Sequence, residues 1–416
     1  MIAANLLSFV TRQEGKKFLR LSQEGEGGIV PLAEAGVPSE VSLYIHIPFC
    51  RVLCPFCCFN RYLFKEDKAK AYFRNLKQEL DFYIQRGYRF SHVYFGGGTP
   101  TVLMDELLEF IDYLKEQFEI KEISLETTPP EITPRNVALL QEAGINRLSI
   151  GVQSFDDDIL QAMGRTLCTG EEAKESLLMA QGHFDTLNAD FIFNFPFQPI
   201  EKFEADIATF KDLGIDQVTF YPLMPSPHKR NALERRFQQV DNSQEKRYYD
   251  IILRDLYSQG YKASTVWCFS REERMIDEYI VDFPDYIGIG SGSVSLVKGN
   301  FYVNAFSLEH YQELIQSGRL PIIRWRRLSE SEYLRYYLLT KLFGMKVDAG
   351  LFRRNFHADI HRKLRSELLF LKLAGLVEGE EIIMVTRRGM YPVNVMMRDF
   401  FTALNGLREY CIRHQI

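Results

Sequence analysis

Three cysteines in the first part of the chain have a spacing that suits an iron–sulfur cluster. Cys50, Cys54 and Cys57 form a Cys-x3-Cys-x2-Cys triplet directly after an apolar run at residues 43–47. Iron–sulfur clusters normally take four cysteine thiolates, so three on one loop would leave one iron of a 4Fe–4S cubane open to an external ligand. A zinc site would instead require two separated pairs or a histidine complement. We therefore predict that Cys50, Cys54 and Cys57 bind a 4Fe–4S cluster.

The remaining cysteines do not extend this pattern. Four of the seven cysteines fall between residues 50 and 58, and such clustering favours metal or redox chemistry over a disulfide framework. A fourth ligand at Cys58, directly beside Cys57, would be sterically awkward. We expect the Cys58 side chain to point away from the cluster, and the sequence assigns no function to Cys168 or Cys268.

The elements that must position this loop alternate regularly along the chain. Apolar, β-branched or aromatic runs predict buried strands at 43–47, 92–95, 122–125, 147–150, 189–193 and 217–221. Amphipathic stretches between them predict helices at 68–86, 104–118, 134–143, 170–182 and 200–214. This alternation indicates parallel βαβ units, in a barrel or part of one. The active sites of such barrels lie where the strands end.

The regions before and after this α/β core show different sequence patterns. Residues 1–40, with glycines and a proline near the end, are expected to form an irregular N-terminal leader. Residues 41–310 are expected to form the core barrel and its extension, and residues 311–416 a small helical or winged-helix-like C-terminal domain. In that domain we expect helices at 331–343 and 360–374 and a strand pair at about 376–386, with Gly389 as a turn.

The composition of the chain bears on whether it binds nucleic acids or spans a membrane. The chain has 50 Lys and Arg against 55 Asp and Glu, a net charge of −5, which gives no electrostatic reason to expect nucleic-acid binding. No apolar run reaches the roughly 18 residues that a membrane span needs. Residues 1–10 are apolar but follow no basic region, so we expect no signal peptide and a cytoplasmic location.

The segment Tyr44-Ile-His-Ile-Pro-Phe-Cys50, followed by Cys54 and Cys57, resembles the signature of the radical S-adenosylmethionine (SAM) enzymes of the coproporphyrinogen-dehydrogenase-like (HemN-like) family. The likeness runs from about residue 41 to about residue 401. It implies a partial (β/α)6 barrel and a SAM molecule chelating the open iron. It also implies that cluster reduction cleaves SAM to a 5′-deoxyadenosyl radical, with electrons from a low-potential donor such as flavodoxin or ferredoxin.

The resemblance also implies which residues contact SAM. In the family's pattern a Gly-rich segment receives the SAM amino group, and carboxylates at strand ends hold its ammonium or ribose hydroxyls. An arginine meets its carboxylate as a charged donor. The positions that match these contacts are Tyr44, Gly97, Gly98, Thr99, Glu126, Gln153, Arg165, Asp190 and Pro222.

The chain differs from individual branches of the family, and these differences reduce the number of possible functions. The oxidase branch carries a further cysteine where this chain has Phe59, and the chaperone branch has Asp at the position of Cys58 and a motif missing from residues 265–271. The remaining branches are haem-opening methyltransferases and class C methyltransferases. Resemblance to class C implies two SAM molecules, the second held by residues 288–292, with Gly290 and Val294 as its contacts.

We therefore predict a radical SAM methyltransferase that acts on an aromatic ring, with the 8-position of the menaquinone naphthoquinone as its target. This preference rests on a general similarity of residues 303–308 and the Trp267 segment to the menaquinone enzymes. The alternatives are an oxygen-independent coproporphyrinogen oxidase or haem-modifying enzyme, and a haem chaperone. Each reading requires a flat aromatic ligand, a quinone or a tetrapyrrole, for which Phe195, Phe197, Trp267 and Phe269 are candidate walls.

Overall fold

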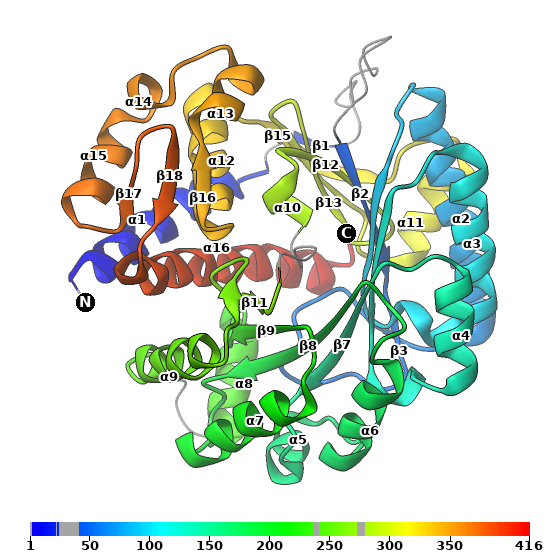
Figure 1. The fold of residues 1–416 in the computed structure, drawn as a ribbon. Coiled ribbons are helices and arrows are strands. Elements are labelled where there is room, and N and C mark those ends of the chain that lie inside the picture. The colour runs from blue at the N-terminus through cyan, green and yellow to red at the C-terminus, as the bar shows by residue number, and fades with distance from the viewer. Residues whose placement is uncertain (1, 22, 25–40, 237–240, 273–278) are drawn as a thin grey trace.

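The computed structural model describes residues 2–21, 23–24, 41–236, 241–272 and 279–416 (Figure 1). Its centre is a 13-stranded sheet. Parallel pairing joins, in spatial order, β12 (Asp285–Ile289), β2 (Val41–Ile47), β5 (His92–Gly97), β6 (Glu122–Thr127), β7 (Arg147–Gln153), β8 (Thr186–Phe193) and β9 (Gln217–Pro222). The strands predicted from the sequence are present as β2 and β5 to β9, and the α/β barrel-type fold is confirmed. β12 is a parallel neighbour that the sequence analysis did not predict.

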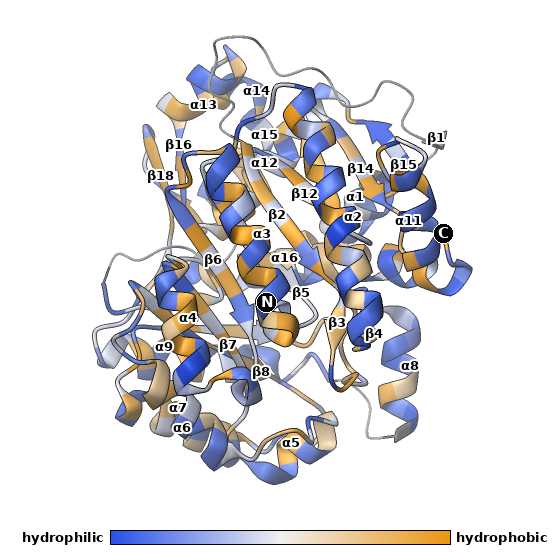
Figure 2. Cartoon of the chain, turned by 90° about the vertical axis from the view of Figure 1, so that its right-hand side faces the viewer, coloured by the Kyte–Doolittle hydropathy of each residue, from blue (hydrophilic) through white to orange (hydrophobic). Residues whose placement is uncertain are grey.

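Helices cover the outer face of these strands, which explains why most side chains along the strands are buried. The covering helices are α2 (Glu66–Gln85), α3 (Met104–Gln117), α4 (Pro134–Glu142), α6 (Gly170–Ala180) and α7 (Ile200–Leu213), all at the expected places. A parallel strand with helices on its outer face and side chains inside the barrel has no polar face, and β2 is buried at every position. In Figure 2, β2 is largely hydrophobic, whereas the helices in front of it carry hydrophilic stretches.

Antiparallel strands extend the sheet at both ends. Beyond β12 lie β13 (Val294–Val297), β14 (Asn300–Asn304), β15 (Ile322–Arg327) and β1 (Gln23–Glu24), and beyond β9 lie β11 (Cys268–Ser270) and β10 (Lys262–Ala263). The connecting helices are α5 (Asp157–Met163), α8 (Pro227–Arg236), α9 (Glu245–Ser258), α10 (Tyr279–Asp282) and α11 (Leu308–Gln316). The domain division after residue 310 stays a prediction, and β15 continues the large sheet beyond that point.

The C-terminal region is helical, as expected. It contains α12 (Glu330–Phe343), α13 (Ala349–Phe356), α14 (Ile360–Lys363), α15 (Arg365–Leu373) and α16 (Arg387–His414), with a small sheet of β16 (Lys346–Asp348), β18 (Ile382–Val385) and β17 (Val377–Glu378). The expected turn at Gly389 is wrong, because Gly389 lies in the first turn of α16, where Thr386 caps its N–H. A Cβ there would lie 2.0 Å from the Leu376 carbonyl oxygen, so the glycine permits close packing.

The expected irregular leader is also corrected at its start, because residues 2–18 form helix α1 (Ile2–Phe18). Its partner is α16, which runs alongside it (Figure 1). Ser8 donates a hydrogen bond to Asp399 over 2.5 Å, and Phe18 is buried against Phe301 and Phe400. The glycines and proline that suggested irregularity, at 25–31, lie outside the described residues. None of the described helices is long and apolar enough to cross a membrane.

A buried carboxylate ties α2 to the sheet extension. Glu79 of α2 accepts hydrogen bonds from the Tyr311 hydroxyl (2.6 Å), the Asn304 side-chain amide (2.6 Å) and the Gly290 backbone N–H (2.7 Å). Burial raises the pKa of Glu79 to about 7, although these donors partly offset the effect. One side chain therefore joins α2, β14, α11 and the loop after β12.

This network predicts a pH-dependent stability. The folded-state pKa of Glu79 lies above its unfolded value, so the folded protein binds the extra proton, and stability from this group is lost as the pH rises from about 4.5 to about 7. Relative to wild type, Glu79→Gln should gain stability across that window, by at most about 3 kcal/mol. Urea unfolding at several pH values measures the difference. Glu313→Gln, on the exposed side of α11, is the control and should show no such trend. A pH-independent difference for Glu79→Gln would contradict the assignment.

Candidate active site

A cavity of about 320 Å³ lies at the C-terminal ends of the parallel strands, within the size range of roughly 300–1,000 Å³ typical of small-molecule sites. Most of the residues singled out from the sequence line it. These are Tyr44, Cys50, Cys54, Cys57, Gly97, Gly98, Thr99, Glu126, Gln153, Arg165, Asp190 and Pro222. They come from segments spread over almost 180 residues, and the strand ends bring them together.

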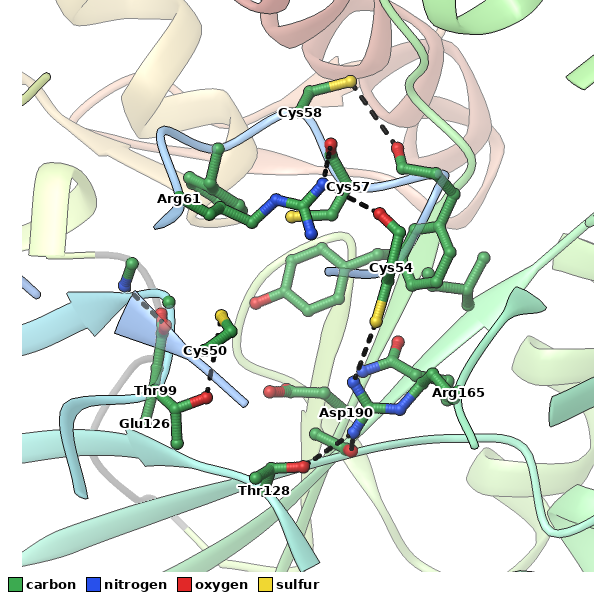
Figure 3. Close-up of a pocket in the computed structure, with 18 of the residues that line it drawn as sticks. Cys50, Cys54, Cys57, Cys58, Arg61, Thr99, Glu126, Thr128, Arg165 and Asp190 are labelled. Carbon is green, nitrogen blue, oxygen red and sulfur yellow. Dashed lines mark hydrogen bonds between the residues drawn. The ribbon is translucent and has the colours of Figure 1, made fainter. Parts of the chain in front are cut away.

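The cysteine loop directs three sulfur atoms toward one space (Figure 3). Cys50 ends β3 (Phe49–Cys50), which pairs with β4 (Tyr62–Leu63), and the Thr99 hydroxyl donates to its sulfur over 3.8 Å. Arg165 donates to the sulfur of Cys54 over 4.0 Å. The Cys58 sulfur points the other way and accepts from the backbone N–H of Ser226 over 3.4 Å. Cys58 therefore faces away from the other three thiols, as expected.

This donor set fits an iron–sulfur cluster. All seven cysteines are free thiols, and burial, followed by the nearby Cys57, raises the pKa of Cys50 to about 11, so a cation is needed to hold it as a thiolate. Among the described residues no three donors are placed to hold a single metal ion. Each thiolate of a cubane binds a different iron, so the ligands of a cluster do not have to converge on one point.

Arg61 is a site residue that the sequence analysis missed. Its guanidinium donates to the backbone carbonyl oxygens of Cys54 (2.8 Å) and Cys57 (3.0 Å), and so fixes the turn that carries both cysteines. Its charge also acts to lower the pKa of Cys50, against the larger effect of burial. The only sequence signal is an arginine soon after the triplet, which is too common to be informative.

The Gly-rich segment after β5 packs against the cysteine loop. A Cβ on Gly98 would lie 2.6 Å from the Phe49 carbonyl oxygen. Gly97 has φ of +118°, and a Cβ on it would lie 2.6 Å from the His46 ring. The backbone N–H groups of Gly98 and Thr99 donate to Ile47 and Phe49, each over 2.8 Å. Gly98 is therefore required for a close approach between two backbones, and Gly97 for a close approach to the His46 ring, whatever ligand they also contact.

The polar groups at the other strand ends are held by neighbours. Glu126 of β6 accepts from the Tyr94 hydroxyl (2.9 Å) and the Gly97 N–H (3.1 Å). Asp190 of β8 accepts from Ser149 (2.8 Å) and Asn188 (2.7 Å). Such contacts fix the side chains before a ligand arrives, which lowers the entropic cost of binding.

Arg165 is held by hydrogen bonds, and Gln153 has an unusual backbone conformation. Arg165 donates to the Gly151 carbonyl oxygen (2.5 Å) and the Thr128 hydroxyl (2.9 Å). Gln153, at a register shift between β7 and β8, has φ of +74°, a strained conformation for a residue other than glycine. Strain of this kind is typical of functional sites.

Gly290 and Val294, the expected contacts of a second SAM, do not line this cavity, and their assignment stays a prediction. Both are buried, and Gly290 has φ of +98° with Tyr72 so close that a Cβ would lie 2.4 Å from its hydroxyl. The glycine does permit a close approach, but its partners are Tyr72 and Glu79. Of the candidate aromatic walls Trp267 lines the cavity, whereas Phe195 and Phe269 are buried elsewhere.

Helix α16 adds a wall that the sequence analysis did not predict. Phe401, Asn405 and Arg408 line the cavity from this helix. They lie more than 170 residues beyond the last predicted barrel strand, and no local pattern links them to the cysteines. Only the packing of α16 across the barrel reveals their place.

Comparison with known proteins gives consistent results. Residues 44–210 match the Radical SAM superfamily. Heme chaperone HemW of Bacillus subtilis is 27% identical over 386 residues, which cover 87% of this chain and all of the relative. Oxygen-independent coproporphyrinogen III oxidase of Helicobacter pylori (strain J99 / ATCC 700824) is 28% identical, over 89% of this chain and 87% of the relative. The solved structure of coproporphyrinogen III oxidase (HemN) from Escherichia coli matches with a TM-score of 0.72 and 25% identity, over 88% of this chain and 91% of that one.

The sulfur geometry predicts which cysteines hold iron. Cys50→Ala, Cys54→Ala and Cys57→Ala should each lose most bound iron and sulfide after anaerobic reconstitution, since each removes one cluster ligand. Cys58→Ala is the matched control and should retain both, because its sulfur faces Ser226. Iron and sulfide analysis with the visible spectrum measures this. Retention in Cys57→Ala with loss in Cys58→Ala would reverse the ligand assignment.

The position of Glu126 predicts an effect on SAM without an effect on iron. Glu126→Gln keeps the shape but removes a charged hydrogen-bond acceptor, which should weaken SAM binding roughly ten- to a hundredfold. Glu122→Gln, at the opposite end of the same strand, should bind SAM as wild type does. Anaerobic calorimetry on the cluster-loaded protein, with iron content determined in parallel, tests this. Equal affinities of the two variants would exclude Glu126 from the SAM site.

Proposed function

Because this chain carries a radical SAM domain and has HemN-like homologues, we propose that it is a radical SAM enzyme that acts on a tetrapyrrole. The observation that carries the proposal is the composition of the cavity. Three thiols and the charged side chains of Glu126, Arg165 and Asp190 share it with an apolar and aromatic wall. The same cavity therefore has groups for polar cofactors and a surface for a flat ring system.

The residues of this chain have separable tasks in the proposed enzyme. A 4Fe–4S cluster and SAM, the cofactors of this superfamily, supply a 5′-deoxyadenosyl radical when bound. Cys50, Cys54 and Cys57 would hold the cluster, on a loop that Arg61 orders. Glu126 would accept from SAM, as would Asp190, and Arg165 would donate to its carboxylate.

The apolar wall would bind and shield the substrate. Phe56, Tyr221, Trp267 and Phe401 line the cavity, and Tyr221 and Trp267 pack edge to face with ring centroids 5.6 Å apart. A wall of this kind excludes water from the reacting centre, which protects a radical from side reactions. An extended aromatic macrocycle would bury more apolar area against it than a small polar substrate would.

The quinone methyltransferase reading has less support than its tetrapyrrole alternative. Residues 303–308, whose similarity favoured a quinone, do not line the cavity. Asn304 donates to Glu79, and the Phe306 carbonyl oxygen accepts from Asn60 and Tyr62. These contacts place the segment behind the cysteine loop, so its sequence bears on packing and not on substrate choice. The homologues described above are an oxidase and a chaperone of haem metabolism by name.

A haem chaperone is the second candidate, favoured by the full-length similarity to HemW. A chaperone and an enzyme would share the tetrapyrrole site and differ in whether SAM is consumed. An electron donor such as flavodoxin or ferredoxin, expected from the sequence, would be needed only if the protein is an enzyme.

Turnover separates these functions. The reduced, cluster-loaded protein would be incubated anaerobically with SAM and either coproporphyrinogen III, haem or a menaquinone-type naphthoquinone. We expect 5′-deoxyadenosine to form in a tetrapyrrole-dependent manner, with Cys50→Ala as the inactive control, and mass spectrometry to show decarboxylation or ring opening. Haem binding without SAM cleavage would support the chaperone. Methylated quinone together with S-adenosylhomocysteine would restore the methyltransferase.

A further inference from the structure

We propose that Arg408, on helix α16, binds a carboxylate substituent of the substrate. This inference rests on the proposed function, because it assigns the acidic edge of a tetrapyrrole to one residue of the cavity wall. Arg408 lies on the same face of the helix as Phe401 and Asn405, at spacings of four and three residues, and all three line the cavity.

The helix face is held rigidly. Asn405 donates to the Met224 carbonyl oxygen over 2.8 Å and accepts from Arg408 over 3.0 Å. Earlier in α16, the buried Arg398 forms an ion pair with Glu245 over 2.6 Å. A binding group on such a helix is positioned before the ligand arrives, which reduces the entropic cost of using it.

Arg408 differs from the other arginines of the cavity. Arg51 pairs with Glu131 over 2.6 Å, Arg61 donates to the cysteine loop, and Arg165 donates to Gly151 and Thr128. In the part of the chain that the structure describes, Arg408 has Asn405 as its hydrogen-bond acceptor and no carboxylate within ion-pair distance. A guanidinium carries five N–H donors, so most of the donors of Arg408 have no acceptor among the described residues.

The surroundings of Arg408 define the ligand it suits. Its guanidinium carbon lies 4.7 Å from the centre of the Phe59 ring, a cation–π contact that leaves the donor edge free. Phe401, Trp267 and Met224 line the cavity nearby. An apolar wall beside a planar cation complements a flat, apolar body with an acidic edge, because the guanidinium fork binds a carboxylate through two parallel hydrogen bonds.

The same geometry disfavours a ligand without an acid. A neutral quinone on this wall would exclude water from Arg408 without offering it an anion, and an unpaired charge is costly to desolvate. A porphyrin that carries propionate groups offers both the apolar face and the anion. Phe59, which contacts Arg408, stands at the position where the oxidase branch of the family carries a further cysteine.

The test compares an acid with its ester. Coproporphyrin III and its tetramethyl ester would be titrated into the full-length, cluster-loaded protein, with quenching of porphyrin fluorescence as the readout. Arg408→Gln should weaken binding of the acid roughly ten- to a hundredfold and leave binding of the ester unchanged. Arg408→Lys should fall between Arg408→Gln and wild type, because it keeps the charge but not the fork. Arg413→Gln, at an exposed position in the last turn of α16, should match wild type.

Each other outcome has a defined meaning. If Arg408→Gln binds the acid as tightly as wild type, the carboxylate assignment is wrong and the proposed function stands. If the variant loses the acid and the ester equally, Arg408 has a structural role and the assignment is again overturned. If wild-type protein binds neither ligand while it still binds SAM, the proposed function itself fails and the assignment fails with it.

Discussion

The close approach of residues 96–99 to residues 47–49 is the contact on which the candidate site depends. Two backbone hydrogen bonds and the absence of side chains at Gly97 and Gly98 hold the end of β2 and the first cysteine against β5. The other end of the loop is fixed by His46, which hydrogen-bonds to the Tyr44 hydroxyl through Nδ1 and to the Asn60 carbonyl oxygen through Nε2, each over 2.9 Å.

The protonation state of His46 is consistent with these two hydrogen bonds. Burial lowers the pKa of His46 to about 4, so the ring is neutral near neutral pH. A carbonyl oxygen can only accept, so Nε2 carries the hydrogen and Nδ1 accepts from Tyr44. The cysteine loop is therefore tied at its start by glycine packing and at its end by one histidine tautomer.

The sequence predicted the parts of this arrangement that depend on local pattern. Parallel strands that are covered on both faces are mostly apolar, so the apolar runs of β2 and β5 to β9 stood out, and the cysteine spacing follows from ligands on a single loop. Other features depend on long-range packing. Gly290 predicted a close approach, but the sequence could not show that Tyr72 is the residue it approaches. Likewise, the sequence of α16 could not show that Arg408 would reach a cavity built by residues 44–224.

The pairing of α1 with α16 has a consequence for the order in which the molecule assembles. Ser8 and Asp399, which join the two helices, are separated by 391 positions, whereas each βαβ unit of the barrel closes a short loop. Contacts between distant segments form late, because their loop-closure entropy is lost before they contribute any stabilisation. The βαβ units of the barrel are thus expected to form before α1 packs against α16.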